Sequence, residues 1–520
     1  MLPDKEKLRF ILAEDVILHY CSDVFTNYRI LDKALIRITR NADINMEEAL
    51  YDHDVDLRDV MGELLKKRKK LSPVRMELSG KLDDSAIKYL CANLDLTTNQ
   101  IIATEGPLDM GFIFPLRNRL EENHPELFNK PVSPQRPSSV IHGVPMIRQI
   151  LSHDILLSYP YESIRPFITL LNEAANDPDV VSMKITLYRL ASNSKVVEAL
   201  INAAENGKDV FVLVELRARF DEENNIEWSK RLERAGCKVM YGPESLKVHS
   251  KLLLITRKNG EKLEYITQIG TGNYNEKTSE LYTDLSLMTA DMNIGAEAGT
   301  VFNALSIGNL VENTTYLMVA PLSLQNKIIN LIDMQIAEAA CGKPAYIGLK
   351  LNSLTDKVLI DKLIEASCAG VRIDMVIRGI CCLVAGVEGQ TENITVRSIV
   401  GRYLEHSRIY IFGAGEDRKV YISSADFMTR NTLRRVEVAA PINSPKIKKR
   451  VLDIFRILMS DNTKARIQQS DGTYRRARPQ SEHDEPICAQ EYFIEEAQKN
   501  AEKSAQKKAT AVKVRIRRVK

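Results

Sequence analysis

Apolar and polar residues follow one pattern in the opening of this chain and another after it. From Lys5 to about Ile38 apolar residues recur at helical spacing, which predicts an α-helical start. The segment SPVRMEL predicts a strand, and DDSAIKYLCANL begins with acidic residues that favour a helix start. The stretch PVSPQRPSSV, residues 131–140, is rich in proline and serine and predicts a linker or exposed loop. We therefore expect an α-rich, α+β head domain over residues 1–135.

Beyond this loop, short β-branched segments alternate with amphipathic helices. One strand–helix–strand–helix–strand order is predicted by VVSMKITLYR, KVVEALINAAENG, KDVFVLVEL, NNIEWSKRLERAG and KVHSKLLLI. The second half repeats this kind of order with AYIGLKLNSL, TDKVLIDKLIEASCAG, VRIDMVIRG, EHSRIYIF and KVYISSADF. The glycines that end the matching helices, Gly207 and Gly370, lie 163 residues apart, and the histidines His249 and His406 lie 157 residues apart. Such near-constant offsets indicate two tandem copies of one α/β unit, and the alternation favours a mostly parallel sheet.

Two α/β domains are therefore expected at residues 136–316 and 317–485, followed by a basic tail at 486–520. From about Asn500 the tail reads KNAEKSAQKKATAVKVRIRRVK and holds one acid. A solvated, disordered segment and a polyanion-binding arm are both compatible with this composition.

The composition is that of a globular protein whose charges nearly balance. Hydrophobic residues make up 44% of the 520 residues, and 72 Lys and Arg face 69 Asp and Glu. Attraction to polyanions must therefore come from the placement of the charges. The eight cysteines form no CxxC pair, which predicts reduced thiols in a cytoplasmic protein. No signal peptide or membrane span is predicted, and peripheral membrane association stays open.

Each predicted repeat carries a histidine that is followed two residues later by a cation. The sequences are KVHSK, with His249 and Lys251, and LEHSR, with His406 and Arg408. In a strand, residues i and i+2 point to one face, so each histidine should share a face with its cation. With the repeats packed about a pseudo-twofold axis, one imidazole would attack phosphorus and the other would handle the proton or the leaving oxygen. A lone buried histidine is usually a core residue, but two at matching positions favour a site.

Arginines stand at the ends of several predicted strands. Arg189 ends KITLYR, Arg217 and Arg219 follow VFVLVEL, and Arg378 ends VRIDMVIRG. The carboxyl ends of strands face the binding crevice in an open α/β sheet, and a guanidinium binds phosphate oxygens through two donors. Surface charge is the alternative for any one arginine, whereas four near one edge favour clamps for a highly charged phosphate ligand.

Turns of small polar residues follow both histidine strands, GTGNYNEKTSELYTD and SSADFMTRN. Their donors can bind an oxyanion, although a plain hairpin has the same letters; the candidates are Gly270, Thr271, Gly272, Asn273, Ser423 and Ser424. No Walker or protein-kinase motif appears. No carboxylate or Cys/His cluster suggests a metal cage, so Mg²⁺ is expected to arrive with a nucleotide.

Several long phrases resemble bacterial polyphosphate kinases, and they cover residues 155–465 almost continuously. They include SYPYESIRPFITLLNEAANDP, ELRARFDEENN, LKVHSKLLLI, GTGNYNEKTSELYTDLSL, VIRGICCL and RYLEHSRIYIF. The opening resembles the head domain of that family more loosely. The resemblance implies two tandem phospholipase-D-like α/β domains after a head domain, and a homo-oligomer. It also implies transfer of phosphate between ATP and inorganic polyphosphate with Mg²⁺, through a phosphohistidine at His249, and no specific nucleic acid as a partner.

The resemblance also implies roles for other residues. The positions that contact the nucleotide fall on Tyr282, Arg378 and His406, and those associated with magnesium and phosphate fall on Arg189 and Arg219. Because arginine carries only donors, we expect the last two to bind phosphate oxygens around the metal and not the metal itself.

The chain departs from two related patterns. The family normally begins with a further helical domain that supplies an asparagine to the nucleotide, whereas this chain starts at the head domain. Either the chain is a truncated form, or it is a natural short variant with a reduced affinity for ATP. Phospholipase-D-type phosphodiesterases resemble HxKxxxxD in both halves, but the aspartate position is Thr256 in the first copy and Gly413 in the second. The second departure argues against a phosphodiesterase. That activity and a catalytically impaired polyphosphate-binding paralogue are the two alternatives.

Overall fold

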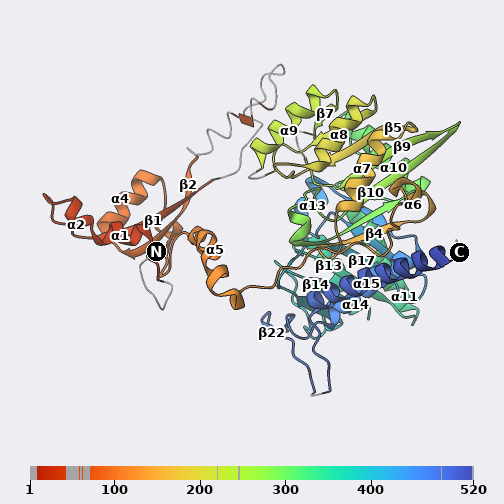
Figure 1. Ribbon diagram of the computed structural model, residues 1–520. Coiled ribbons are helices and arrows are strands. Elements are labelled where there is room, and N and C mark those ends of the chain that lie inside the picture. The colour runs from red at the N-terminus through yellow and green to blue at the C-terminus, as the bar shows by residue number, and fades with distance from the viewer. Residues whose placement is uncertain are drawn as a thin grey trace. The chain divides into compact units, whose positions relative to one another are not determined.

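The computed structural model describes residues 9–41, 58, 61–62, 71–218, 221–243, 246–481 and 483–517. Arg219, one of the expected phosphate-binding residues, lies outside the described residues. The chain forms two compact units, Met1–Pro131 and Val132–Lys520, which are described separately (Figure 1).

The first unit is built on a three-stranded sheet. The strand β1 (Lys33–Arg40) pairs antiparallel with β2 (Pro73–Lys81), which pairs parallel with β3 (Ile101–Ala103). The helices of this unit are α1 (Ala13–His19), α2 (Cys21–Val24), α4 (Asp84–Leu94) and α5 (Ile113–Asn123). The mixture of helices and a small sheet agrees with an α+β head domain.

One predicted element of this unit is wrong and two are confirmed. The helical spacing was expected to continue to Ile38, but Lys33–Arg40 form the strand β1. β-branched Ile36, Ile38 and Thr39 favour extended backbone, and Lys33 to Thr39 each face a partner residue in β2, so strand pairing prevails over the apolar period. The predicted strand β2 and helix α4 are present, and the carboxylate of Asp83 caps α4 by accepting from the amide of Ala86 at 2.7 Å.

The second unit contains two large sheets, one for each predicted repeat. The first repeat, Ile155–Thr289, contributes β4 to β11, and strands of its sheet stand in the order β16-β11-β10-β9-β5-β6-β7, with β4 also paired to β11. Its strands are β4 (Ile155–Tyr159), β5 (Val180–Leu187), β6 (Asp209–Val214), β7 (Lys238–Tyr241), β8 (Lys247–Val248), β9 (Leu252–Asn259), β10 (Lys262–Gly270) and β11 (Tyr282–Thr289). Its helices, of which the first precedes this range and the last follows it, are α6 (Met146–Ser152), α7 (Arg165–Asn176), α8 (Lys195–Glu205), α9 (Glu222–Arg234) and α10 (Met292–Ser306).

The second repeat, Met318–Pro441, forms a sheet in the order β12-β20-β18-β17-β13-β14-β15-β21-β22. Its strands are β12 (Met318–Val319), β13 (Tyr346–Leu351), β14 (Arg372–Ile377), β15 (Ile394–Ser398), β16 (Leu404–Glu405), β17 (Arg408–Phe412), β18 (Lys419–Ser423), β19 (Arg435–Val436) and β20 (Val438–Pro441). Two further strands follow the repeat in the sequence, β21 (Arg466–Gln468) and β22 (Tyr474–Arg476). The helices are α11 (Leu324–Ala340), α12 (Lys357–Cys368), α13 (Thr429–Leu433), α14 (Pro445–Ser460) and α15 (Ala489–Arg517).

The order of the strands confirms the tandem repeat and the α/β fold class. The strands β11-β10-β9-β5-β6-β7 of the first sheet correspond one by one to β20-β18-β17-β13-β14-β15 of the second. Each sheet is mixed and not mostly parallel, because only two of the five pairings among these six strands are parallel. Short connections account for the antiparallel part: β9 and β10 are joined by a tight turn at Gly260 and Glu261, which admits no crossover helix.

The C-terminal segment expected as a tail is helical through Arg517. In Figure 1 the helix α15, drawn in dark blue, lies beside α14. Ala489 and Phe493 are buried and Ala497 packs against the same core, so the four-residue spacing of these side chains gives the start of α15 an apolar face. This packed start of α15 precedes Asn500, so the solvated segment and the polyanion-binding arm both stay predictions for the residues beyond it.

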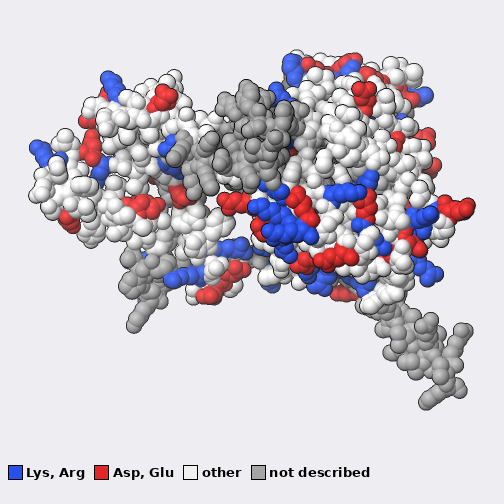
Figure 2. Space-filling model, turned by 90° about the horizontal axis from the view of Figure 1, so that it is seen from above, with Lys and Arg blue, Asp and Glu red and all other residues white. Residues whose placement is uncertain are grey.

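Acidic and basic side chains are mixed over the surface seen in Figure 2. The near-equal numbers of acidic and basic residues in the sequence are thus matched by a face that carries side chains of both signs. Within the described parts of the chain, no helix has the length and apolar character needed to cross a membrane.

Candidate active site

The two predicted catalytic histidines occupy matching positions in the two repeats, but neither lies within a strand. His249 stands between β8 and β9, and His406 stands between β16 and β17. The two-residue strand before each histidine pairs with the other repeat: β8 pairs parallel with β19, and β16 pairs parallel with the start of β11. The prediction of one continuous strand through each histidine is therefore wrong, because these short strands leave their own sheets to join the other repeat.

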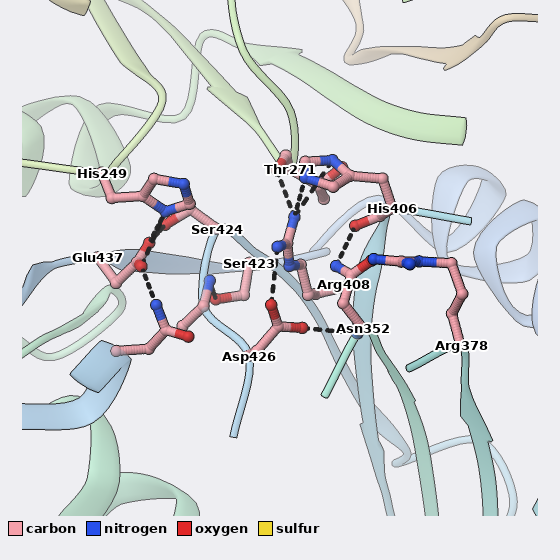
Figure 3. Close-up of polar contacts among 12 residues, drawn as sticks. His249, Thr271, Asn352, Arg378, His406, Arg408, Ser423, Ser424, Asp426 and Glu437 are labelled. Carbon is pink, nitrogen blue, oxygen red and sulfur yellow. Dashed lines mark hydrogen bonds and ion pairs between the residues drawn. The ribbon is translucent and has the colours of Figure 1, made fainter. Parts of the chain in front are cut away.

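His249 is held by a carboxylate that the second repeat supplies. Its Nδ1 lies 2.9 and 3.0 Å from the two carboxylate oxygens of Glu437, which is fully buried (Figure 3). Ser424 donates its hydroxyl to Glu437, and Asn431 donates its amide to the same carboxylate at 2.7 Å. Two further donors suit an ionised, acceptor-only carboxylate. The imidazole therefore donates from Nδ1, and Nε2 keeps its lone pair.

His406 has the reciprocal arrangement, with a carboxylate from the first repeat. Its Nδ1 lies 2.9 Å from both carboxylate oxygens of Asp284, and Thr271 donates its hydroxyl to Asp284 at 2.6 Å. The carboxylate approaches the backbone closely here, since a Cβ on Gly272 would lie 2.0 Å from its Oδ2. Each half of the site thus orients the histidine of the other half.

Burial and nearby cations keep the site histidines neutral. The pKa of His249 is held well below its usual value, first by burial and then by Lys251, Arg435 and Arg408. The pKa of His406 is lowered by burial and by Arg408, and Asp284 opposes that shift. A neutral imidazole with a free Nε2 is a nucleophile at physiological pH.

The two cations predicted beside the histidines are buried in the same cluster. Lys251 donates to the backbone oxygen of His249, and burial lowers the pKa of Lys251 to about 7. Arg408 has one Nη atom 3.1 Å from His406 Nε2, and its other Nη atom donates to Asp426 at 2.8 Å. Burial of Asp426 is outweighed by Arg408, which holds the pKa of that carboxyl well below its usual range. Arg408 is thus fixed by a partner, whereas Lys251 can change its charge near neutral pH.

The turns expected to supply oxyanion donors are mostly occupied by the fold. The amide of Gly270 donates to Lys251 O, and the amide of Thr271 donates to Leu285 O, each at 2.9 Å. In the second repeat the Ser423 hydroxyl donates to Val438 O at 3.2 Å. The other second-repeat candidate, Ser424, has both its amide and its hydroxyl engaged. These donors are therefore not available to an oxyanion, because they hydrogen-bond the backbone or side chains of neighbouring strands.

Asn273 and Gly272 lie in the same first-repeat turn. The Oδ1 atom of Asn273 is buried and has no hydrogen-bond partner among the described residues. Its expected contact with ATP or phosphate therefore stays a prediction.

The expected nucleotide-binding residues lie on the His406 side of the site. Arg378 donates from Nε to Asn352 at 3.2 Å and to the backbone oxygen of Glu405 at 3.0 Å. The ring of Tyr282 lies 5.3 Å from that of His406, centroid to centroid. Figure 3 shows Arg378 and Asn352 beside Arg408, and these contacts fix one edge of the Arg378 guanidinium.

Two of the expected arginine clamps have different surroundings on the His249 side. Arg189 forms an ion pair with Asp221 at 3.0 Å and lies against Tyr188, whose ring packs edge-on against His249 at 4.8 Å. Arg217 donates to Glu215 at 3.0 Å and to the backbone oxygen of Leu246. Arg217 therefore braces the segment that leads to His249, in place of the expected role as a phosphate clamp.

Glu437, Asp284 and Asp426 are the site residues that the sequence analysis missed. Glu437 and Asp284 lie 188 and 122 residues from the histidines that they contact, whereas Asp426 lies 18 residues from Arg408. A search for acids at matching repeat positions could have found Glu437 and Asp284, which lie directly before β20 and within β11, the corresponding strands of the two sheets.

A metal was expected to arrive with the nucleotide. Among the described residues no group of three or more His, Cys, Asp or Glu side chains is arranged to hold a metal ion. Arg189 carries only donors and cannot be a direct ligand. The residues present fit contacts to phosphate oxygens around a metal better than contacts to the metal.

A duplicated α/β fold with a buried, carboxylate-anchored histidine from each repeat is suited to an enzyme that displaces a group at phosphorus through an imidazole. The family models for the polyphosphate kinase middle domain, C-terminal domain 1 and C-terminal domain 2 match residues 1–116, 145–335 and 317–516. The chain therefore belongs to the polyphosphate kinase family.

Similar proteins support this assignment over most of the chain. The polyphosphate kinase of Halalkalibacterium halodurans is 42% identical over 97% of this chain and 72% of its own length. The polyphosphate kinase of Bacillus anthracis is 42% identical over 90% of this chain and 66% of its own length. The crystal structure of polyphosphate kinase from Porphyromonas gingivalis superposes with a TM-score of 0.79 at 33% identity, covering 94% of this chain and 71% of that one. The chain thus spans about two thirds to three quarters of these relatives.

Proposed function

We propose that this chain transfers the γ-phosphate of ATP reversibly to inorganic polyphosphate, through a phosphohistidine at His249. The observation that carries the proposal is the pairing of His249 with Glu437, which leaves a neutral imidazole with its Nε2 lone pair free. The curated relatives, which are named polyphosphate kinases, supply the substrate class.

In the first step Nε2 of His249 attacks the γ-phosphorus of ATP. A phosphorus–nitrogen bond forms, the bond from phosphorus to the bridging oxygen breaks, and ADP leaves with the electron pair. The imidazole ring becomes positively charged because Nδ1 keeps its proton, and Glu437 at 2.9 Å stabilises that charge. In the second step a terminal oxygen of polyphosphate attacks the same phosphorus, and His249 leaves in its neutral form. Formation of ATP from polyphosphate follows the same path in reverse.

The remaining site residues have supporting roles in this proposal. Protonated Lys251 neutralises non-bridging oxygens beside His249, and Arg408 does so beside His406. The negative charge of bound phosphates favours protonation of His406 at Nε2, and the resulting imidazolium donates to the oxygen that leaves or enters. Arg378 and Tyr282 bind the nucleotide on that side, where both are anchored next to the second histidine.

Magnesium enters this reaction on the phosphates of ATP. The ion would neutralise charge on the phosphate oxygens, and Arg189 would contact those oxygens. Arg219, outside the described residues, is proposed for the same role by resemblance.

The proposal extends to the environment of the chain and its assembly. The eight cysteines are free, which fits the reducing cytoplasm. In the first unit Val24, Tyr28, Leu31 and Phe114 are each more than 70% exposed, which supports a role of the head domain in homo-oligomer formation. Light scattering on the purified chain tests the assembly, and a monomer at micromolar concentration would contradict it.

The central experiment is incubation with γ-labelled ATP and Mg²⁺, followed by analysis of acid-labile phosphate on the protein. Label is expected on the wild-type chain and on His153→Ala, an exposed histidine on the same unit, but not on His249→Ala. Chase with polyphosphate should remove the label and lengthen the polymer. Absence of label on a folded wild-type chain would contradict the proposal, as would label that comes from a phosphodiester and not from ATP.

A further inference from the structure

A buried glutamine joins the C-terminal helix to the strand that precedes His406. Gln490 lies in the first turn of α15 and is 2% exposed. Its Nε2 donates to the backbone oxygen of Tyr403 at 2.9 Å and to Glu405 Oε1 at 2.7 Å, and its Oε1 accepts from the amide of Tyr403 at 3.0 Å. Both ends of this side-chain amide therefore bind the segment that carries β16.

The carboxylate that Gln490 contacts belongs to a buried ion pair. Glu405 and Lys350 are 3% and 1% exposed, and Lys350 Nζ lies 2.9 Å from Glu405 Oε2. Thr283 donates its hydroxyl to the same oxygen at 3.0 Å. Lys350 also donates to the backbone oxygen of Ser407 at 3.2 Å. A buried pair of this kind requires every hydrogen bond, because a lost partner leaves an uncompensated charge.

These contacts lie on both sides of His406 without touching its ring. Glu405 precedes the histidine and Ser407 follows it, and the amide of His406 itself donates to Thr283 at 3.1 Å. The backbone oxygen of Glu405 also accepts from Arg378. The cluster therefore fixes the backbone from which the imidazole projects, whereas Asp284 and Arg408 fix the ring.

The position of Gln490 is in turn fixed by tight packing. A Cβ added to Gly401 would lie 2.6 Å from Gln490 Oε1, so only glycine leaves room for this amide. On the other side, the amide of Ala489 donates to the fully buried carboxylate of Asp461 at 2.8 Å. Phe493, one turn along α15, is buried in the core. The start of α15 therefore cannot shift without disturbing the cluster.

We propose that Gln490 is a positioning residue for phosphoryl transfer, which connects helix α15 through Glu405 and Lys350 to His406. This inference rests on the proposed function. His249 has a different brace, because the amide of Val248 donates to Glu215 at 2.7 Å, and Glu215 follows β6 of the same repeat. The two halves of the site are thus supported differently: the His406 half depends on the C-terminal helix, which lies after both repeats.

The test replaces the amide without changing the size of the side chain. Gln490→Met keeps the volume and removes all three hydrogen bonds, and Gln498→Ala, at an exposed position of the same helix, is the matched control. Stoichiometric label on His249 counts competent sites, and kcat is then expressed per labelled site. A displacement of about 1 Å can cost up to roughly 100-fold in rate, so we expect kcat per site to fall about tenfold or more.

The Michaelis constant separates positioning from loss of binding. We expect KM for ATP to change by less than about twofold, because Asn352 still holds Arg378. Gln490→Glu would place a second carboxylate beside Glu405 and should lower kcat further. A purely structural role would reduce the number of labelled sites and leave kcat per site unchanged, and that result would overturn the proposal.

A second readout keeps the inference separate from the proposed activity. In a chain labelled with [15N]histidine, the His406 signals are assigned by their loss in His406→Ala. Gln490→Met should shift these signals and leave those of His249 in place. Unshifted His406 signals would overturn the inference even in an active enzyme. A wild-type chain that takes no label from ATP would refute the proposed function, and the NMR result would still decide whether Gln490 positions His406.

Discussion

Replacement of Glu437 by glutamine isolates the role of the carboxylate that orients His249. The two side chains are nearly equal in size, so the fully buried site remains filled. The change removes the negative charge 2.9 Å from His249 Nδ1 and places an amide donor within reach of the imidazole. We expect phosphorylation of His249 to slow strongly for both reasons.

The size of the effect follows from the contacts of Glu437. A hydrogen bond to a charged group contributes about 1.5–3 kcal/mol, which corresponds to roughly 10- to 150-fold in rate. An amide donor facing Nδ1 also favours the tautomer with its proton on Nε2, which cannot attack. In serine proteases the equivalent aspartate-to-asparagine change costs about 10⁴-fold in kcat. Labelling of His249 should therefore slow by about 10²- to 10⁴-fold.

Protein stability should change in the opposite direction from activity. Burial raises the pKa of Glu437 above its usual value, and Lys251 and Arg435 only partly oppose that shift. A carboxyl group whose pKa is higher in the folded state stabilises the fold below its unfolded-state pKa, and this contribution is lost as the pH rises through the folded-state pKa. At neutral pH the ionised group is thus a cost that glutamine removes. The melting temperature of Glu437→Gln should equal or exceed that of the wild-type chain.

Rapid quench with γ-labelled ATP in a single turnover measures the first step directly, and scanning calorimetry at the same pH measures stability. Glu388→Gln, at an exposed position of the same unit, controls for loss of one negative charge. Labelling within about threefold of the wild-type rate would refute the assignment of Glu437 as the orienting group. A lower melting temperature together with slow labelling would point to a structural role instead.

Three other predictions concern the same site. Asp284→Asn should slow turnover by about tenfold or more, because His406 loses a charge-assisted hydrogen bond; an unchanged kcat would exclude a role for that pair. In the free enzyme kcat/KM for ATP should fall above about pH 7, where Lys251 loses its proton, and Lys251→Arg should abolish that fall in a pH–rate profile. Gly272→Ala should reduce activity to the level of Asp284→Asn, because its Cβ would lie 2.0 Å from the carboxylate, whereas Gly299→Ala, with a nearest contact at 3.7 Å, should retain activity in the same assay.

The sequence predicted the elements that are encoded locally. The helices α8 and α12 carry their own apolar period, and each ends near a glycine with positive φ, Gly207 or Gly370. Strands such as β5 have their own β-branched residues. The nearly equal offsets between the two copies were then enough to select both histidines from the amino-acid pattern alone.

The pairing of each histidine with its carboxylate could not be predicted in this way. Glu437 is 188 residues from His249, and Asp284 is 122 residues from His406. Neither distance is a repeat length, because each carboxylate reaches its histidine only when β8 and β16 pair with the opposite repeat. Two-residue strands carry no periodic signal, so their pairing depends on the docking of the two sheets.

The crossed pairing of β8 with β19 and of β16 with β11 makes the two repeats mutually dependent. A single repeat expressed alone would hold a histidine without its carboxylate and a carboxylate without its histidine. Two copies of one repeat that associate symmetrically would complete both histidine–carboxylate pairs, because each copy would supply the acid for the other's histidine. In the present chain the covalent link fixes the ratio of the copies at one to one. The two copies can then differ in sequence and in role: the first would supply the nucleophile, and the second would bind the nucleotide.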